Sequence, residues 1–121
     1  KSLSGAKNTP PLAPDGLLSV PSVGGRVDLS WNAASDPNTA ATGLTYEIRV
    51  GSSAAAIDVM APRADPQTGR RRVVRPGRAG SSTSWYLDDL APGTYYWSVQ
   101  AVDNSYAGSP FAAEQTFTIT N

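Results

Sequence analysis

The densest charge in this 121-residue chain lies in the segment PRADPQTGRRRVVRPGR, where six arginines face a single acidic residue, Asp65. A guanidinium presents a planar fork of donors that matches carboxylate and phosphate groups. If these side chains converge on one face, they could bind an anionic glycan, another anionic polymer or an acidic partner domain. The alternative is a solvated loop whose arginines diverge and pair with Asp58, Asp88 or Asp89. The six are Arg63, Arg70, Arg71, Arg72, Arg75 and Arg78.

Short clusters of Asp and Asn stand in three expected loops. They are found at residues 36–38, 88–89 and 103–104. Carboxylate and amide oxygens are the ligands that Ca²⁺ prefers, but none of these spacings resembles a calcium loop. Asp and Asn also favour turns, because their side chains bond to the nearby backbone. We therefore expect structural turns here and no metal or other cofactor.

Catalysis is limited by what the chain lacks, since it contains neither His nor Cys. That excludes imidazole acid–base chemistry, thiol nucleophiles, disulfides and Cys/His zinc sites. A serine nucleophile would have no histidine base beside it. Glu47 and Glu114 are both predicted on outward strand faces, so they do not suggest a cleft with paired carboxylates. We expect that the protein is not an enzyme.

Charge and hydropathy argue against nucleic acid and membranes as partners. Lys plus Arg equals Asp plus Glu at 10 each, so no global field attracts nucleic acid, and no nucleic-acid motif is present. No apolar run is long enough to cross a membrane, so we expect no membrane insertion. Residues 1–4 contain neither an initiator Met nor a signal peptide, and we expect the chain to be a piece of a longer protein.

The elements that must position these residues are predicted from period-2 alternation. Val27, Leu29 and Trp31 share one face of the stretch GRVDLSWN, which indicates a half-buried strand. The same pattern recurs over residues 44–50, 82–87, 94–102 and 114–120. A short edge strand is expected at 16–20, AIDVM and RRVV are candidates for further strands, and no amphipathic helix is predicted. This pattern favours an antiparallel sandwich over its structural rival, a closed barrel.

Alternation also sorts the large side chains into core and surface. It leaves Tyr86, Tyr96 and Tyr106 as candidates for the outside, where a tyrosine could stack on a sugar or simply shield a sheet edge. Tyr106 lies with Asn104 and Ser105 in a candidate recognition loop between the last two strands. The expected structural core contains Trp31, Tyr46, Trp85, Leu90, Tyr95, Trp97 and Phe117.

Four motifs in the right order give the chain a family resemblance over about residues 10–120. Trp31 in VDLSW, Tyr46 in LTYEIRV, the stretch LDDLAPGTYYWSVQAVD and the stretch SPFAAEQTFTI are similar to the motifs of a fibronectin type III domain. The resemblance implies an all-β, immunoglobulin-like/fibronectin type III β-sandwich of about seven antiparallel strands. It also implies a linker at residues 1–11, a domain at 12–121, and a long, irregular Arg-rich insert at 51–81, after the third strand.

The resemblance further implies a tyrosine corner, in which a ring packs in the core while its hydroxyl bonds back to the preceding turn. The spacing from Leu90 indicates Tyr96. Strand alternation indicates Tyr95, because this residue shares a face with Trp97 and Val99. We favour Tyr95, since a one-residue slip would turn the whole strand inside out.

A narrower similarity, to the type III-like modules of large exported bacterial proteins that often carry FG-GAP repeats, suggests a function. It implies a non-catalytic structural spacer or protein-interaction module within a larger secreted or surface-attached bacterial protein. Adjacent domains of the same polypeptide would be its partners, with a protein or glycan as a further ligand. One alternative is a binding module that uses the Arg-rich insert for anionic glycans, other polymers or a partner domain. Another is an accessory domain of a carbohydrate-active enzyme.

Overall fold

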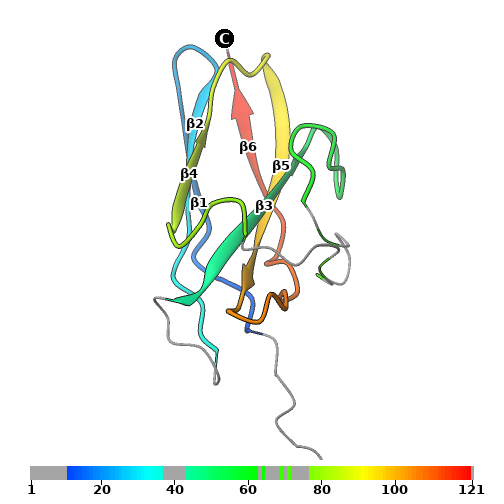
Figure 1. The fold of residues 1–121 in the computed structure, drawn as a ribbon. Coiled ribbons are helices and arrows are strands. Elements are labelled where there is room, and N and C mark those ends of the chain that lie inside the picture. Colours follow the sequence, from blue (N-terminus) through cyan, green and yellow to red (C-terminus); the bar gives the residue numbers. More distant parts are fainter. Residues whose placement is uncertain are drawn as a thin grey trace, which may run out of the picture.

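Six strands form the protein in a computed structural model, which describes residues 11–36, 43–62, 64, 69, 71 and 77–120 (Figure 1). Within these ranges there is no α-helix, so the all-β prediction is confirmed. In chain order the strands are β1 (Leu18–Ser22), β2 (Arg26–Ser30), β3 (Thr45–Gly51), β4 (Ser84–Leu87), β5 (Gly93–Val102) and β6 (Gln115–Ile119).

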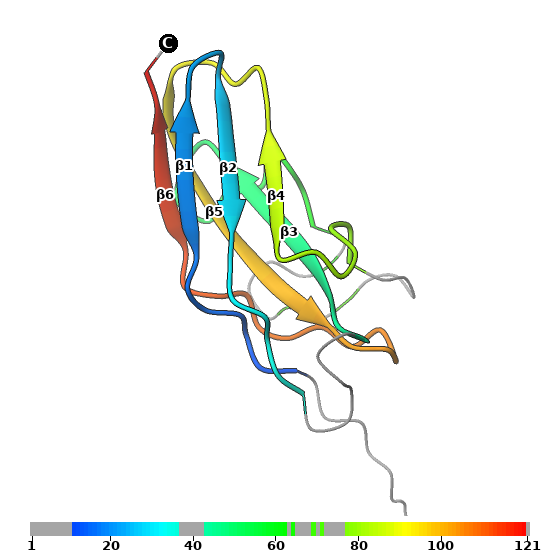
Figure 2. The ribbon, with the colours of Figure 1, turned by 90° about the vertical axis from the view of Figure 1, so that its left-hand side faces the viewer.

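The strands pair as two separate antiparallel sheets, in the orders β1-β2-β4 and β3-β5-β6. β1 of the first sheet lies beside β6 of the second (Figure 2), but the two strands belong to different ladders. The architecture is therefore a β-sandwich and not a closed barrel. Its strand order fits an immunoglobulin-like domain, in which the first, second and fifth strands share one sheet and the third, sixth and seventh share the other.

The described part of the chain contains six strands where about seven were expected. The candidates AIDVM and RRVV supply only isolated bridges there, between Val50 and Met60 and between Ala64 and Arg71. Residues 72–76 lie outside the described residues. The long connection from β3 to β4 thus stands where a further edge strand was expected.

The core forms between the two sheets because inward-facing residues alternate along the strands. Trp31 packs against Tyr46 and Trp97, with ring centroids 5.6 and 6.4 Å apart. Tyr95 stacks on Phe117 of the neighbouring strand at 5.2 Å. Burial of each large apolar side chain contributes about 1.5–3 kcal/mol. Two expected core residues, Trp85 and Leu90, are only partly buried and pack against this cluster.

The turn before β5 is closed by one tyrosine. The Tyr95 hydroxyl donates a hydrogen bond to the Ala91 carbonyl oxygen across 2.6 Å, and the Tyr95 ring is buried. Tyr96 is paired with Thr116 on the other face of the strand and has no part in this bond. The corner tyrosine is therefore Tyr95, as strand alternation indicates.

The chain is held against the sandwich before β1 begins. Pro11 is buried, and the Leu12 N–H donates to the Ser35 carbonyl oxygen at 3.0 Å. Asn32 donates in the same way to Asp15 at 2.8 Å. These first described residues lie at the end of the sandwich opposite to the C-terminus (Figure 1). The two ends of the domain therefore leave it at opposite poles.

The connection from β3 to β4 returns twice to the edge of β3 that faces away from β5. Val50 and Met60 exchange backbone hydrogen bonds of 3.0 Å. Further along, the Ala79 N–H donates to the Tyr46 carbonyl oxygen at 2.9 Å, and the Tyr46 N–H donates to Gly80. This covering of the edge places the connection, and the charged residues that it carries, next to β3.

Candidate functional site

The outer face of β3 and β5 carries a buried charge pair in place of the solvated polar face that alternation predicts. Arg71, from the connection, donates from Nη1 to Glu47 Oε1 at 2.8 Å and to Gln100 Oε1 at 3.0 Å. Only 4% of the Arg71 side chain and 0% of the Glu47 side chain are exposed. The expectation of an outward, solvated Glu47 is wrong, because the connection covers this face of the sheet.

Gln100 ties three separate segments together at this pair. It stands opposite Glu47 in the register of β3 and β5. While its carbonyl oxygen accepts from Arg71, its amide nitrogen donates to the carbonyl oxygens of Gly69 at 2.8 Å and Ser109 at 2.9 Å. The Ser109 hydroxyl in turn accepts from the Ala101 N–H at 2.9 Å. Buried polar groups are costly unless they are hydrogen-bonded, so these bonds stabilise the connection on the sheet.

A second charge pair lies on the same face, one row along β3. Arg49 donates from Nη1 to Glu114 at 2.7 Å, and its guanidinium carbon lies 5.3 Å from the centre of the Phe111 ring. Glu114 also accepts the Ala55 N–H at 3.0 Å. Arg49 shares the strand face of Glu47, which alternation assigns to solvent, but it is buried, since the connection and the segment before β6 meet over it.

The two arginines of the Arg-rich segment that the structure describes both turn toward Glu47. Arg78 approaches Glu47 Oε2 with Nε at 3.5 Å, and 39% of its side chain is exposed. Arg71 is enclosed, so it cannot contribute to a polyanion-binding surface. The other four predicted members, Arg63, Arg70, Arg72 and Arg75, lie outside the described residues.

Asp58, an expected partner of these arginines, serves the connection itself. Its carboxylate accepts the Ser52 N–H at 2.9 Å and the Ser52 hydroxyl at 2.6 Å. These two hydrogen bonds, the hydroxyl bond first, lower the pKa of the Asp58 carboxyl below its ordinary value. Asp58 therefore closes the turn that leaves β3, which is the role that Asp commonly has in loops.

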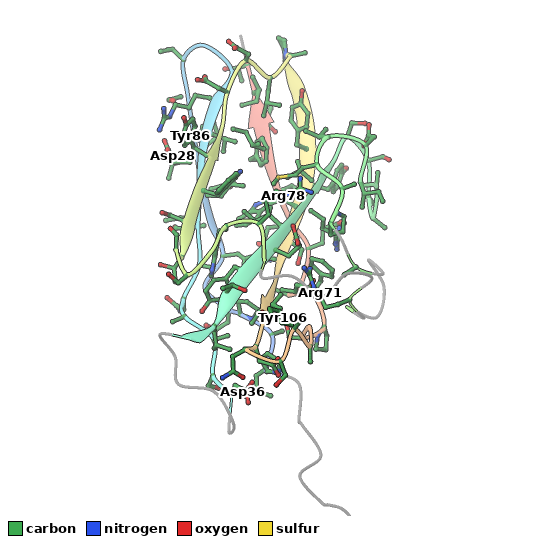
Figure 3. All side chains as sticks on the ribbon, in the orientation of Figure 1. Asp28, Asp36, Arg71, Arg78, Tyr86 and Tyr106 are labelled. Carbon is green, nitrogen blue, oxygen red and sulfur yellow. The ribbon has the colours of Figure 1, made fainter. Side chains whose placement is uncertain are left out.

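The outer face of the other sheet carries an exposed cluster of Arg26, Asp28 and Tyr86. Arg26 donates to Asp28 at 2.9 Å, and its guanidinium carbon lies 4.3 Å from the centre of the Tyr86 ring. The hydrogen bond from Arg26 lowers the pKa of Asp28, and the same bond raises the pKa of Arg26. Asp28 and Tyr86 both lie on the β2–β4 side of the molecule (Figure 3), away from Arg71.

The candidate recognition loop between β5 and β6 is a tight turn organised by Asp103. One carboxylate oxygen of Asp103 accepts the N–H groups of Ser105 and Ala107, each at 2.9 Å. Tyr106 adopts a positive φ of 66° and is partly exposed. Tyr106 and Asp36 lie toward the same end of the sandwich (Figure 3), and Asn38 is outside the described residues. In the ranges that the structure describes, no group of three His, Cys, Asp or Glu could hold a metal ion.

A groove that alternation alone does not predict opens between β4 and the connection. We call it the edge groove. Its volume is about 520 Å³, within the range of known binding pockets. Residues 59–60, 78 and 85–88 build it together, so no single stretch of the sequence indicates it. The edge groove is lined by Val59, Met60, Arg78, Trp85, Tyr86, Leu87 and Asp88.

Comparison with known proteins places the fold. No family model matches the sequence, and no curated protein matches it. Among solved structures, the rat CD45 extracellular region, domains d3-d4, is similar with a TM-score of 0.60 at 15% identity, over 92% of this chain and 52% of that one. The Clostridium perfringens spore cortex lytic enzyme SleM is similar with a TM-score of 0.52 at 16% identity, over 93% of this chain and 29% of the enzyme.

At these identities the likeness concerns the fold alone, and the chain spans about half of the CD45 fragment and less than a third of the enzyme. The class is therefore an antiparallel β-sandwich module with an immunoglobulin-like strand order. The part of the chain that the structure describes includes no helix both long and apolar enough to cross a membrane.

Proposed function

We propose that this domain is a non-catalytic spacer module of the fibronectin type III kind within a larger secreted or surface-attached protein. The observation that carries the proposal is the course of the chain, which enters at one pole of the sandwich and leaves at the other (Figure 1). Adjacent domains of the same polypeptide would then be separated by the full length of the sandwich.

Rigidity supports the spacing role. The outer face of β3 and β5, which is commonly solvated in a small sandwich, is fastened to the connection by the pairs Glu47–Arg71 and Arg49–Glu114. Opening of the connection would break the hydrogen bonds between Arg71 and Glu47 and between Arg49 and Glu114, so these bonds oppose it. A spacer needs a connection that does not open under load or in changing salt.

The chemistry of the acidic residues supports a role without catalysis. Glu47 and Glu114 each contact an arginine at hydrogen-bond distance. Asp58 and Asp103 use their carboxylates to accept backbone N–H groups. These four carboxylates are therefore engaged in structural bonds. The chain has no His or Cys that could act with them as a base or a nucleophile.

For the setting we propose the exterior of a bacterial cell, in a protein of the kind that also carries FG-GAP repeats. The likeness to an extracellular region, that of rat CD45, fits an exterior location. A second candidate is an accessory domain of an enzyme that acts on carbohydrate. The observation that favours it is the similarity to the spore cortex lytic enzyme, of which a region of this size is one part.

The spacing role is tested by measuring the separation of the two poles. The chain has no Cys, so Leu12→Cys with Thr120→Cys places two spin labels at exposed positions near opposite ends. Pulsed electron–electron double resonance should give a single narrow distribution of the distance between the two labels, unchanged by salt. In the reference pair Leu12→Cys with Ser35→Cys, whose backbones are hydrogen-bonded, the labels lie too close for this method and should broaden the continuous-wave spectrum instead.

Two results would contradict the proposal. A broad pole-to-pole distribution would show a domain too flexible to space its neighbours. Saturable, salt-sensitive binding of a sulfated polysaccharide would instead favour the alternative in which the Arg-rich segment engages polyanions, because exposed charge pairs weaken as salt rises.

A further inference from the structure

The edge groove lies where the two sheets present their outer strands to each other. β4 ends the order of one sheet and β3 ends the order of the other. Val59 and Met60, which pair with Val50 at the edge of β3, line the side opposite to β4. The groove is therefore bounded on one side by a strand edge and on the other by apolar side chains of the connection.

The backbone of β4 offers hydrogen bonds along this groove. Residues of an antiparallel strand point their N–H and C=O groups alternately toward the partner strand and away from it. Thr83 accepts from Trp31, so Ser84 points away from β2, and the Ser82 hydroxyl bonds both Ser84 N at 3.2 Å and Ser84 O at 3.0 Å. Tyr86 is the next residue to point this way. Its backbone N–H and C=O have no partner among the described residues.

In the part of the chain that the structure describes, the protection of this edge thus stops at Ser84. Unpaired strand edges are templates for pairing with another chain, and proteins commonly shield them with charges, prolines or covering loops. Here the described residues of the connection line the groove opposite β4, and none of them is hydrogen-bonded to the backbone of Tyr86. An extended peptide that adds to a sheet edge gains main-chain hydrogen bonds, and pockets for alternate side chains give it specificity.

Charge decides which peptide fits. Glu47 carries one negative charge but contacts two arginines, Arg71 at 2.8 Å and Arg78 at 3.5 Å. Arg71 holds the closer and fully enclosed position, which leaves the half-exposed Arg78 incompletely neutralised at the wall of the groove. A carboxylate beside Arg78 would complete the partnership of Arg78, while a cation at that position would be repelled. Asp88, the acidic residue of the lining, follows β4, so the carboxylate of the peptide is placed at Arg78 and away from Asp88.

We propose that the edge groove binds an extended, acidic–apolar peptide segment of a partner protein. The segment pairs with β4 at Tyr86 and turns apolar side chains and one carboxylate into the groove. Because successive side chains of a strand alternate between two faces, the inward positions are every second residue of the peptide. This binding role goes beyond the spacing role and does not depend on it.

The test is a titration of the isotopically labelled chain with the capped heptapeptide Thr-Val-Thr-Glu-Thr-Val-Thr, in which threonine alternates with the inward-facing valine, glutamate and valine. We expect saturable NMR shifts at residues 59–60, 78 and 85–88, together with slower hydrogen exchange of the Tyr86 amide. The same peptide with lysine in place of glutamate should bind at least about fivefold more weakly.

Variants separate the two components of recognition. Arg78→Gln should weaken the glutamate peptide to the level of the lysine peptide, whereas Arg78→Lys, which keeps the positive charge, should retain the preference for glutamate. Tyr86→Pro removes the edge N–H but no bond of the β2 ladder, so it should abolish binding. Tyr86→Thr keeps that N–H and should bind more tightly than Tyr86→Pro. If the proline variant does not fold, Arg78→Gln and the lysine peptide still decide the matter.

Three outcomes would overturn the proposal. The first is the absence of saturable shifts with both peptides. The second is equal binding of the glutamate and lysine peptides, since the charge argument would then be wrong. The third is concentration-dependent self-association of the chain through residues 85–88, because the occupant of the groove would then be a second copy and not a partner segment.

Discussion

The hydroxyl of Tyr95 donates to the carbonyl oxygen of Ala91 across 2.6 Å, so that the strand β5 is fastened to the turn which precedes it. The ring of the same tyrosine stacks on Phe117 of β6. One side chain therefore joins the turn, the sheet and the core at the place where the chain crosses from one sheet to the other.

Removing this hydroxyl should cost stability without disturbing the core. Tyr95→Phe keeps the stacked ring and loses one hydrogen bond, so we expect a loss of about 0.5–1.5 kcal/mol in the free energy of unfolding. Urea denaturation measures it. Tyr96→Phe is the matched control, because Tyr96 faces outward, and it should change stability by less than about 0.5 kcal/mol. Equal losses in the two variants would show that the corner bond does not stabilise the fold.

The sequence predicts this corner because period-2 alternation survives wherever one face of a strand is buried. Val27 and Leu29 in β2 and Tyr46 in β3 are examples of positions that it places correctly in the core. Alternation is wrong for Glu47 and Arg49, since it assumes that the second face is wet. The hydrogen bonds from Arg71 to Glu47 and from Arg49 to Glu114 join residues that are 24 and 65 positions apart, and no local sequence pattern encodes such separations.

The buried pair on β3 should be more important to the fold than its exposed neighbour. Arg71→Met leaves Glu47 charged and enclosed, and we expect it to cost about 3–5 kcal/mol. Arg78 is the half-exposed partner of the same carboxylate, so Arg78→Met should lower the free energy of unfolding by no more than about 1 kcal/mol. Thermal and urea unfolding distinguish the two.

A double-mutant cycle checks the origin of that loss. If the penalty is the uncompensated charge of Glu47, then Glu47→Leu combined with Arg71→Leu should be less destabilised than the sum of the two single variants. Strict additivity would mean that Arg71 and Glu47 act independently despite their 2.8 Å contact.

Acid should loosen the turn that leaves β3. The two bonds from Ser52 hold the pKa of Asp58 below its ordinary value in the folded chain. The carboxylate therefore contributes its full stability above the unfolded pKa, and that contribution is lost as the pH falls through the folded pKa. We expect the fall of melting temperature toward low pH to be shallower in Asp58→Asn than in the parent. Ser52→Ala should shift the curve in the same direction, and a slope unaffected by either change would contradict this account.

Contact between the connection and β3 depends on a residue without a side chain. A Cβ on Gly77 would lie 2.3 Å from the backbone of Tyr46, and the Gly77 N–H donates to the Thr45 hydroxyl at 2.7 Å. Gly77→Ala should displace the segment, cost about 1–3 kcal/mol and speed hydrogen exchange at the amides of Tyr46 and Ala79. Gly24→Ala places its Cβ in open space and leaves only the strain of a positive φ of 81°. It should destabilise the chain without a selective effect on those two amides.

The opposite exits of the chain have a mechanical consequence. The described chain leads into β1 at one pole and leaves β6 at the other, and both strands point toward the pole of the C-terminus (Figure 2). A pull on the two ends would run along the strand axes, whereas the ladder bonds that hold β1 to β2 and β6 to β5 lie across them. Such a load shears all bonds of a ladder at once and cannot unzip them singly. Stretched between its neighbours, the domain should therefore stay folded until a threshold force is reached and then yield in one step.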